Sequence, residues 1–131
     1  MTPYDTRSLL AWCGHYDGRP PSKEMLRAWH AALHKDLTLA DAKQIVTDHY
    51  AKTNYPIRPA NINAAFLELR RERLRRCPQH ARPQPPSDLD GNDYLIFQNA
   101  VVKALGNGAT PAAAESYAKR QVALRASGGS A

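Results

Sequence analysis

Proline- and glycine-rich breaks recur along this sequence, and they limit its fold more than any other feature. Residues 17–21 (DGRPP), 54–56 (NYP) and 106–108 (GNG) each follow a stretch with helical periodicity, and residues 77–87 (CPQHARPQPPS) hold four prolines. Proline lacks an amide donor and glycine favours turns, so these positions end helices. Alternating β-branched residues are scarce, which disfavours strands. We therefore expect an all-α fold.

The first 76 residues predict a small domain of four helices. The helices are expected from Thr2 or Asp5 to about Tyr16, from Ser22 to about Lys35, from Thr38 to about Thr53, and from Pro59 onward. Apolar residues recur with helical spacing in each segment and form its expected buried face. These residues are Leu9, Leu10, Cys13, Tyr16, Met25, Leu26, Trp29, Leu33, Ala42, Ile45, Val46, His49, Tyr50, Ile62, Phe66 and Leu69.

The remaining residues predict a proline-rich linker, 77–91, and a helical hairpin, 92–131. One helix is expected over 92–105, and Thr110 with Pro111 opens an alanine-rich helix to about Arg125, after which 127–131 (SGGSA) fray. Two helices with so few large apolar groups are marginal alone. They are expected either to dock on the first four helices or to bind a partner.

Composition places the chain among cytoplasmic proteins with reduced thiols. Its 131 residues allow one domain of ordinary size, and 43% of them are apolar, as in globular proteins. No apolar run is long enough to span a membrane, and the N-terminus lacks the order of a secretory signal. The two cysteines, Cys13 and Cys77, are too few for a disulfide-rich scaffold.

The formal charge of +6 is concentrated in one part of the chain. Residues 56–82 hold seven basic and two acidic residues, and the arginines among residues 70–76 surround the helix expected there. A helix with arginines on every side cannot lie flat on a small core, so we expect its last two turns to project into solvent or a partner. Such arginines suit phosphates and carboxylates, while the alternative is a solvated helix end.

Motifs for catalysis, metals and cofactors are weak in this sequence. His30 and His34 are spaced for one metal ion, and Cys77 with His80 offers a second pair, but the pairs lie more than 40 residues apart. Cys13 stands among apolar residues with no activating group in view. Phosphate-binding loops, dinucleotide-binding glycine motifs and hydrolase signatures are missing. We expect no enzyme activity, cofactor or metal.

One stretch of the sequence resembles a known family. A helix with Trp29, a helix with the pair His49 and Tyr50, and a helix begun at Pro59 that runs into arginines succeed one another over residues 22–76. This succession resembles the N-terminal domain of the phage replisome helicase loader and inhibitor family. The resemblance implies a small helical domain, a flexible C-terminal portion that engages a DnaB-type replicative helicase, and an actinobacterial phage or prophage as source. The sequence departs from that pattern in its C-terminal part, which looks helical.

The leading hypothesis is therefore a non-enzymatic phage replication adaptor that binds a DnaB-type helicase to load or inhibit it. Arginines are expected to pair with acidic groups of the partner, and apolar residues of the helix over 92–105 to enter a groove. The expected partner-binding residues are Arg70, Arg71, Arg73, Arg75, Arg76, Leu95, Ile96, Val102 and Leu105. Two alternatives stay open: DNA or RNA binding through the arginine-rich helix 58–76, and capture of another host factor.

Overall fold

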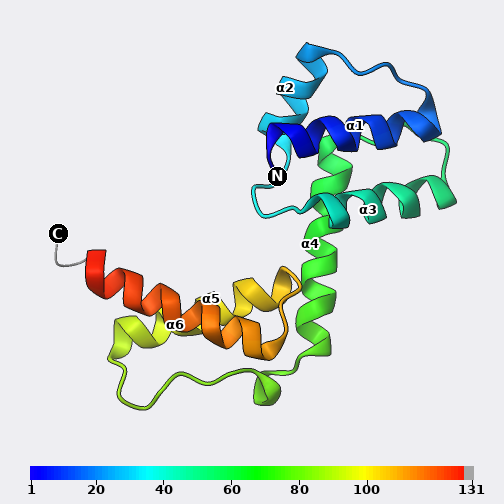
Figure 1. Ribbon diagram of the computed structural model, residues 1–131. Helices are drawn as coiled ribbons and strands as arrows, with labels where there is room; N and C mark the ends of the chain where they lie inside the picture. The colour runs from blue at the N-terminus through cyan, green and yellow to red at the C-terminus, as the bar shows by residue number, and fades with distance from the viewer. Residues whose placement is uncertain (129–131) are drawn as a thin grey trace. The chain divides into compact units, whose positions relative to one another are not determined.

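The computed structural model describes residues 1–128, and within that range it contains helices and no strands. Figure 1 shows α1 (Pro3–Asp17), α2 (Lys23–Ala32), α3 (Leu39–Lys52), α4 (Pro59–Arg76), a short 3-10 helix (Gln79–Ala81), α5 (Gly91–Gly106) and α6 (Pro111–Gly128). The prediction of an all-α fold is confirmed. The chain divides into two compact units, Met1–Glu68 and Leu69–Ala131, here called unit 1 and unit 2.

Helix starts follow the capping residues that the sequence predicted. Thr2 accepts a hydrogen bond from the Asp5 amide at 3.1 Å, and Asp5 accepts one from the Thr2 amide, which completes a capping box. Ser22 caps α2 by accepting a hydrogen bond from the Met25 amide, and Thr38 caps α3 by accepting one from the Asp41 amide. Gly18 ends α1 with a φ of 69°, a left-handed conformation that glycine adopts without strain.

The second helix ends earlier than predicted. It stops at Ala32 rather than near Lys35, because Leu33 is extended with a ψ of 145°. The side chain of Asn63, on α4, caps this end twice: its Nδ2 donates to the Ala32 carbonyl and its Oδ1 accepts from the His34 amide. The helix end is thus set by a residue far along the chain, which local sequence patterns do not reveal.

Unit 1 has one apolar core, to which each of its helices contributes. α1 packs on α2 and α3, and the start of α4 adds Ile62 and Phe66. The buried residues are Leu9, Leu10, Cys13, Trp29, Leu33, Leu37, Ala42, Ile45, Val46, Ile57, Ile62 and Phe66. The prediction that Tyr16 is buried is wrong: it is 45% exposed and stacks on Tyr50, where its hydroxyl stays at the surface.

A polar network joins α1, α3 and the segment before α4. The Asp17 carboxylate accepts hydrogen bonds from Arg19 Nε at 2.8 Å and from the Tyr50 hydroxyl. Tyr50 in turn accepts from the Ile57 amide at 2.9 Å, and Arg19 donates to the Ile57 carbonyl at 2.8 Å. The Arg19 guanidinium also lies 5.3 Å from the ring centre of Trp29.

These contacts shift the pKa values of Asp17 and Tyr50. Burial alone would raise the pKa of Asp17, but the hydrogen bonds from Arg19 and Tyr50 outweigh it and hold that pKa below its ordinary value. Burial and the same bond to Asp17 raise the pKa of Tyr50. The network is therefore strongest with Asp17 ionised and Tyr50 protonated.

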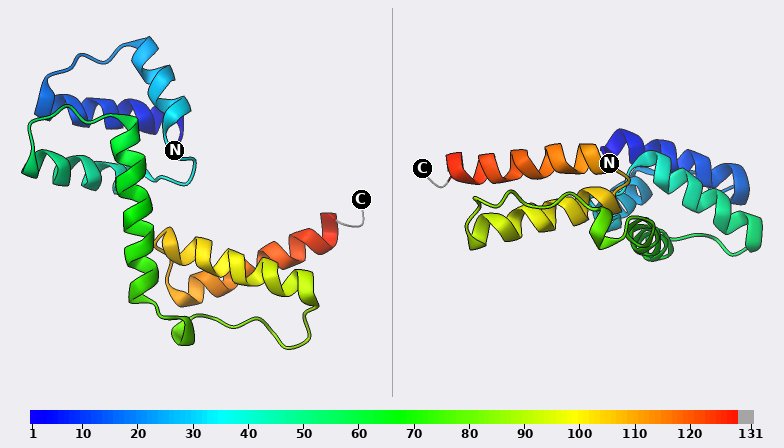
Figure 2. Two further views of the ribbon diagram at one scale, coloured as in Figure 1. Left: turned by 180° about the vertical axis from the view of Figure 1, so that it is seen from behind. Right: turned by 90° about the horizontal axis from the view of Figure 1, so that it is seen from below.

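Unit 2 is built on α5 and α6, which pack side by side in every view of Figures 1 and 2. α5 begins at Gly91, where Asp90 caps it, and Thr110 caps α6. The core is small and rich in alanine: Phe97, Ala100, Val101, Ala104, Leu105, Ala114 and Ala118, with Leu74, Cys77 and Leu89 packed against it. The helix α6 continues to Gly128, past its predicted end near Arg125, so residues 127 and 128 are helical where fraying was expected. Residues 129–131, the rest of that prediction, lie outside the described range.

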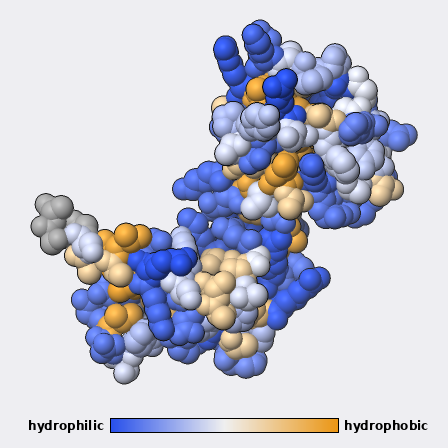
Figure 3. All heavy atoms as spheres, in the orientation of Figure 1, coloured by the Kyte–Doolittle hydropathy of each residue, from blue (hydrophilic) through white to orange (hydrophobic). Residues whose placement is uncertain are grey.

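The face of the molecule drawn in Figure 3 is largely hydrophilic. On this face, polar residues cover most of the area and apolar ones form separate small patches. Among residues 1–128, no helix combines the length and the apolar character that crossing a bilayer requires. The sequence predicted a helical domain over 1–76, a linker over 77–91 and a hairpin over 92–131. That division of the chain stays a prediction.

Candidate partner-binding surface

The inner side of the α4 end packs on the chain itself. Arg73 donates from Nη1 to the Gly106 carbonyl at 3.1 Å and thereby caps the end of α5. The Arg70 side chain lies against Gly106, and the Arg73 guanidinium lies beside Gly108. The expectation that the last two turns project away from the chain is therefore wrong on this side. The added positive charge at a helix C-terminus is favourable, which gives Arg73 a structural role.

A further arginine caps the end of α4, and sequence reasoning missed it. Arg82 donates from Nε to the Cys77 carbonyl at 2.9 Å and from Nη2 to the Leu74 carbonyl at 3.4 Å. The chain between Cys77 and Arg82 makes a short 3-10 turn that brings the guanidinium back to the helix. The only sequence signal was a basic residue soon after the helix end.

The outer side of the α4 end carries exposed arginines. The side chains of Arg75 and Arg76 are 62% and 77% exposed, and both form ion pairs with Glu72. The hydrogen bond from Arg75 lowers the pKa of Glu72 from its ordinary value, and Arg76 adds to this effect. Arg71 is exposed as well. Arginines therefore outnumber glutamates at the exposed positions of residues 68–76, which leaves this side positively charged.

The four apolar residues predicted to bind a partner differ in how far they are exposed. Leu95 is 56% and Val102 38% exposed, and the two lie two helical turns apart on α5. Ile96 is half-buried. Leu105, by contrast, is only 4% exposed and belongs to the core of unit 2. Leu95 and Val102 are thus the members of this set that offer the most apolar surface to a partner.

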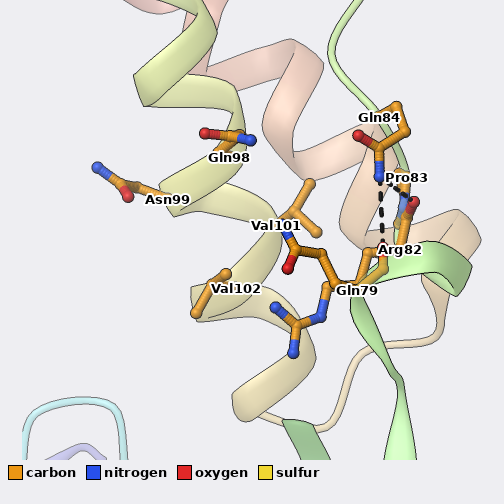
Figure 4. A pocket seen from close by; sticks show the side chains of 8 residues that line it. All are labelled: Gln79, Arg82, Pro83, Gln84, Gln98, Asn99, Val101 and Val102. Atoms are coloured by element: carbon orange, nitrogen blue, oxygen red, sulfur yellow. Dashed lines mark hydrogen bonds between the residues drawn. The ribbon is translucent and has the colours of Figure 1, made fainter.

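A groove of about 200 Å³ runs beside Val102, between α5 and the segment that follows α4 (Figure 4). It is rich in side-chain amides, and its Gln84 donates to the Gln79 and Arg82 carbonyls. Its lining residues are Gln79, Arg82, Pro83, Gln84, Gln98, Asn99, Val101 and Val102. We call it the amide groove. It pairs polar donors and acceptors with a valine wall, as peptide-binding grooves do.

Residues considered for metal binding or nucleophilic chemistry have other roles here. His30 shares a hydrogen bond of 3.0 Å with Thr6, and His34 accepts from the Asp36 amide. Three or more metal-ligating side chains do not gather anywhere in residues 1–128. Cys13 is buried, which raises the pKa of its thiol to about 11 and keeps it unreactive. Cys77 is half-buried.

Unit 1 carries a chain of packed rings that the sequence reading did not identify. Tyr16 and Tyr50 stack with ring centres 5.1 Å apart, and Trp12 and His49 pack edge-on against them. The Trp12 indole donates to the Thr47 hydroxyl, and Lys43 lies 5.1 Å from the indole centre. Hydrogen bonds and ring contacts satisfy these side chains within unit 1. The signal in the sequence was aromatic residues at helical spacing on α1.

The residues expected to act together differ in their surroundings on unit 2. Leu95 and Val102 mark one side of α5, Arg75 and Arg76 the outer side of the α4 end, while Arg73 is tied to the end of α5. Comparison with models of known protein families, with curated proteins and with solved structures gave no match for this chain.

Proposed function

We propose that this chain is a non-enzymatic adaptor of phage replication that binds a DnaB-type replicative helicase, and loads or inhibits it, through unit 2. In this proposal residues 1–76 form the four-helix domain, 77–91 the linker and 92–131 the hairpin. The choice of helicase rests on the resemblance over residues 22–76. The observation that carries the binding proposal is the exposure of Leu95 and Val102 on α5.

Physical arguments support a protein partner at this place. Unit 2 has a core of few large side chains, yet it leaves a leucine and a valine in water on one helix face. Covering such side chains releases water and stabilises a complex. The exposed Arg75 and Arg76 would speed encounter with an acidic partner and set its orientation. The amide groove beside Val102 would hold polar groups of the same partner.

The test measures binding of the purified chain to a purified DnaB-type helicase from an actinobacterial host. Binding is followed by size exclusion and by biolayer interferometry at low salt. The double variant Leu95→Asp, Val102→Asp is expected to weaken binding by about 10- to 100-fold, because it places charge where apolar contact is expected. Leu124→Asp is the matched control, since Leu124 is 63% exposed on α6 and outside this face.

Two results would count against the adaptor proposal. One is the absence of a complex with the helicase at micromolar concentration in low salt. The other is an equal loss of binding in the Leu124 control and in the double variant, which would show that any added negative charge on unit 2 weakens the complex.

A second candidate function, nucleic-acid binding, is favoured by the charge of unit 2. Residues 69–131 hold ten basic and five acidic residues, a formal charge of +5, and Arg71, Arg75 and Arg76 are exposed on α4. Guanidinium groups pair with phosphates regardless of base sequence. The affinity for a single- or double-stranded oligonucleotide would then fall linearly with salt on logarithmic axes.

The matched variants for this candidate are Arg75→Gln with Arg76→Gln, against Arg120→Gln on α6. The double variant is expected to lower the salt slope by about one to two units, because two phosphate contacts are lost. Arg120, which is exposed away from the α4 end, is expected to leave the slope unchanged. Affinity that does not depend on salt would exclude this candidate.

A further inference from the structure

Unit 2 contains a second hollow, distinct from the amide groove, where the end of α4 meets the turn between α5 and α6. Its volume is about 430 Å³. Cys77, Leu105, Ala109 and Pro111 give it an apolar wall, and Arg73 and Arg76 line it as well. We call it the anchor hollow. No aspartate or glutamate is among its lining residues.

The arginines at this hollow are held in place by contacts within unit 2. Arg73 is fixed by its bond to the Gly106 carbonyl, and its guanidinium lies about 3.3 Å from where a Cβ on Gly108 would be. Arg76 is largely exposed and is paired with Glu72 at 3.3 Å through one nitrogen. Glu72 also pairs with Arg75. Because two arginines and no acidic residue line the hollow, the charge of its lining is positive.

We propose that the anchor hollow receives an apolar side chain of leucine or phenylalanine size from an acidic segment of a protein partner. This inference rests on the proposed function, because it names the kind of segment that the helicase or another partner presents. Acidic residues on either side of the apolar one pair with Arg73 and Arg76. The apolar side chain itself fills the space against Leu105, Ala109 and Pro111.

The chemistry of the wall favours a peptide over a nucleic acid. Recognition of a base edge needs amide, hydroxyl or carboxylate groups, or arginine forks directed at the base. Here the uncharged lining side chains are apolar apart from one thiol, and the space suits an aliphatic or phenyl group. Charge complementarity with the arginines then favours a peptide with acidic residues next to its apolar side chain.

The two cysteines allow a direct test of occupancy in the natural sequence. Cys77 lines the hollow and is half-buried, whereas Cys13 is 1% exposed and has a pKa of about 11. Iodoacetamide therefore reacts at Cys77, and mass spectrometry of peptides gives the rate at each cysteine. The probes are an acidic nonapeptide with one central leucine, the same peptide with serine there, and an oligothymidylate.

The leucine peptide is expected to slow alkylation of Cys77 at least about fivefold, the serine peptide much less, and the oligonucleotide not at all. Protection by the oligonucleotide and not by the leucine peptide would overturn the proposal in favour of phosphate binding. Equal rates with and without every probe would overturn it as well. The assay contains no helicase, so it can succeed or fail independently of the proposed function.

Two variants complete the test, with peptide affinity measured by fluorescence anisotropy. Ala109→Leu fills the hollow and is expected to weaken the leucine peptide at least about tenfold, while Ala113→Leu on the exposed side of α6 leaves it unchanged. Arg76→Gln changes an exposed position, so it tests the hollow even if Ala109→Leu fails to fold. It is expected to weaken peptide binding severalfold and to lessen the salt dependence of that binding. Full affinity in both Ala109→Leu and Arg76→Gln would overturn the proposal.

Discussion

Asp17 lies at the centre of the polar network of unit 1. Its side chain is 7% exposed and accepts from Arg19 and Tyr50, whose other bonds reach the Ile57 backbone. Asp17→Asn removes the charge and leaves Arg19 without its ion-pair partner. We expect the free energy of unfolding to fall by about 1–3 kcal/mol at neutral pH, as measured by urea denaturation.

The control for this variant is Asp48→Asn, since Asp48 is exposed and accepts a hydrogen bond from the side chain of Gln44, one turn earlier on α3. It is expected to change stability by less than about 0.5 kcal/mol. A loss of the same size in both variants would show that the Asp17 network adds nothing specific to the stability of unit 1.

The pKa of Asp17 gives a prediction for acid. Because this pKa is lower in the folded than in the unfolded chain, its stabilising effect is complete above the ordinary value of 3.8 and is lost as pH falls through the folded value. The difference in stability between the natural chain and Asp17→Asn should therefore shrink from pH 7 to about pH 3. Urea titrations of both proteins at several pH values check this, and a difference independent of pH would contradict it.

Single residues also show where sequence reasoning succeeds. Thr2, Ser22 and Thr38 were predictable as caps because their partners lie three residues away. Asn63, which ends α2, and Arg82, which ends α4, were not, because their side chains reach carbonyls brought near by the folded chain. Tyr16 has the right spacing for a core residue, and its hydroxyl is what keeps it at the edge.

At the scale of one element, the turn after α5 depends on a glycine. Gly108 has a φ of 98°, and a Cβ there would come within 3.3 Å of the Arg73 guanidinium. Gly108→Ala is expected to lower the stability of unit 2 by about 1–2 kcal/mol, because alanine is strained at this φ and the Arg73 guanidinium must shift by a few tenths of an ångström. Thermal unfolding followed by circular dichroism at 222 nm measures the change.

Gly91, at the first position of α5, is the matched control. A Cβ there meets nothing within 4 Å, and its φ is not in the left-handed region. Gly91→Ala is therefore expected to raise stability by about 0.5–1 kcal/mol, since alanine loses less freedom on folding. A loss of stability at Gly91, or none at Gly108, would contradict this account of the two positions.

The elements as a whole were well predicted, and the surface was predicted in part. Each expected helix exists, with starts near the predicted caps, because caps and prolines are local signals. The arginine-rich helix end was identified, but not that Arg70 and Arg73 turn toward α5, since that depends on a partner helix more than thirty residues later. Leu105 was assigned to a partner for the same reason: its own neighbours in α6 supply the contacts.

At the scale of the whole chain, the two apolar cores share no residue. A change that weakens one core should therefore leave the other intact. Phe97→Leu, at a residue that is 1% exposed, is expected to destabilise unit 2 by about 1–2 kcal/mol. Hydrogen exchange by mass spectrometry should then show faster exchange in α5 and α6 and unchanged rates in α1, α2 and α3. Faster exchange in every helix would show that the cores unfold together.

The positions of the two tryptophans allow the unfolding of the two units to be followed with two different spectroscopic signals. Both tryptophans, Trp12 and Trp29, belong to unit 1, and each has a cationic group over its ring. Melting of unit 2 is therefore silent in indole emission, while the far-ultraviolet dichroism records the helices of both units. Comparison of the melting curve from indole emission with that from far-ultraviolet dichroism distinguishes the unfolding of the two units without labels or truncation. Any difference between the two curves reports the unfolding of unit 2.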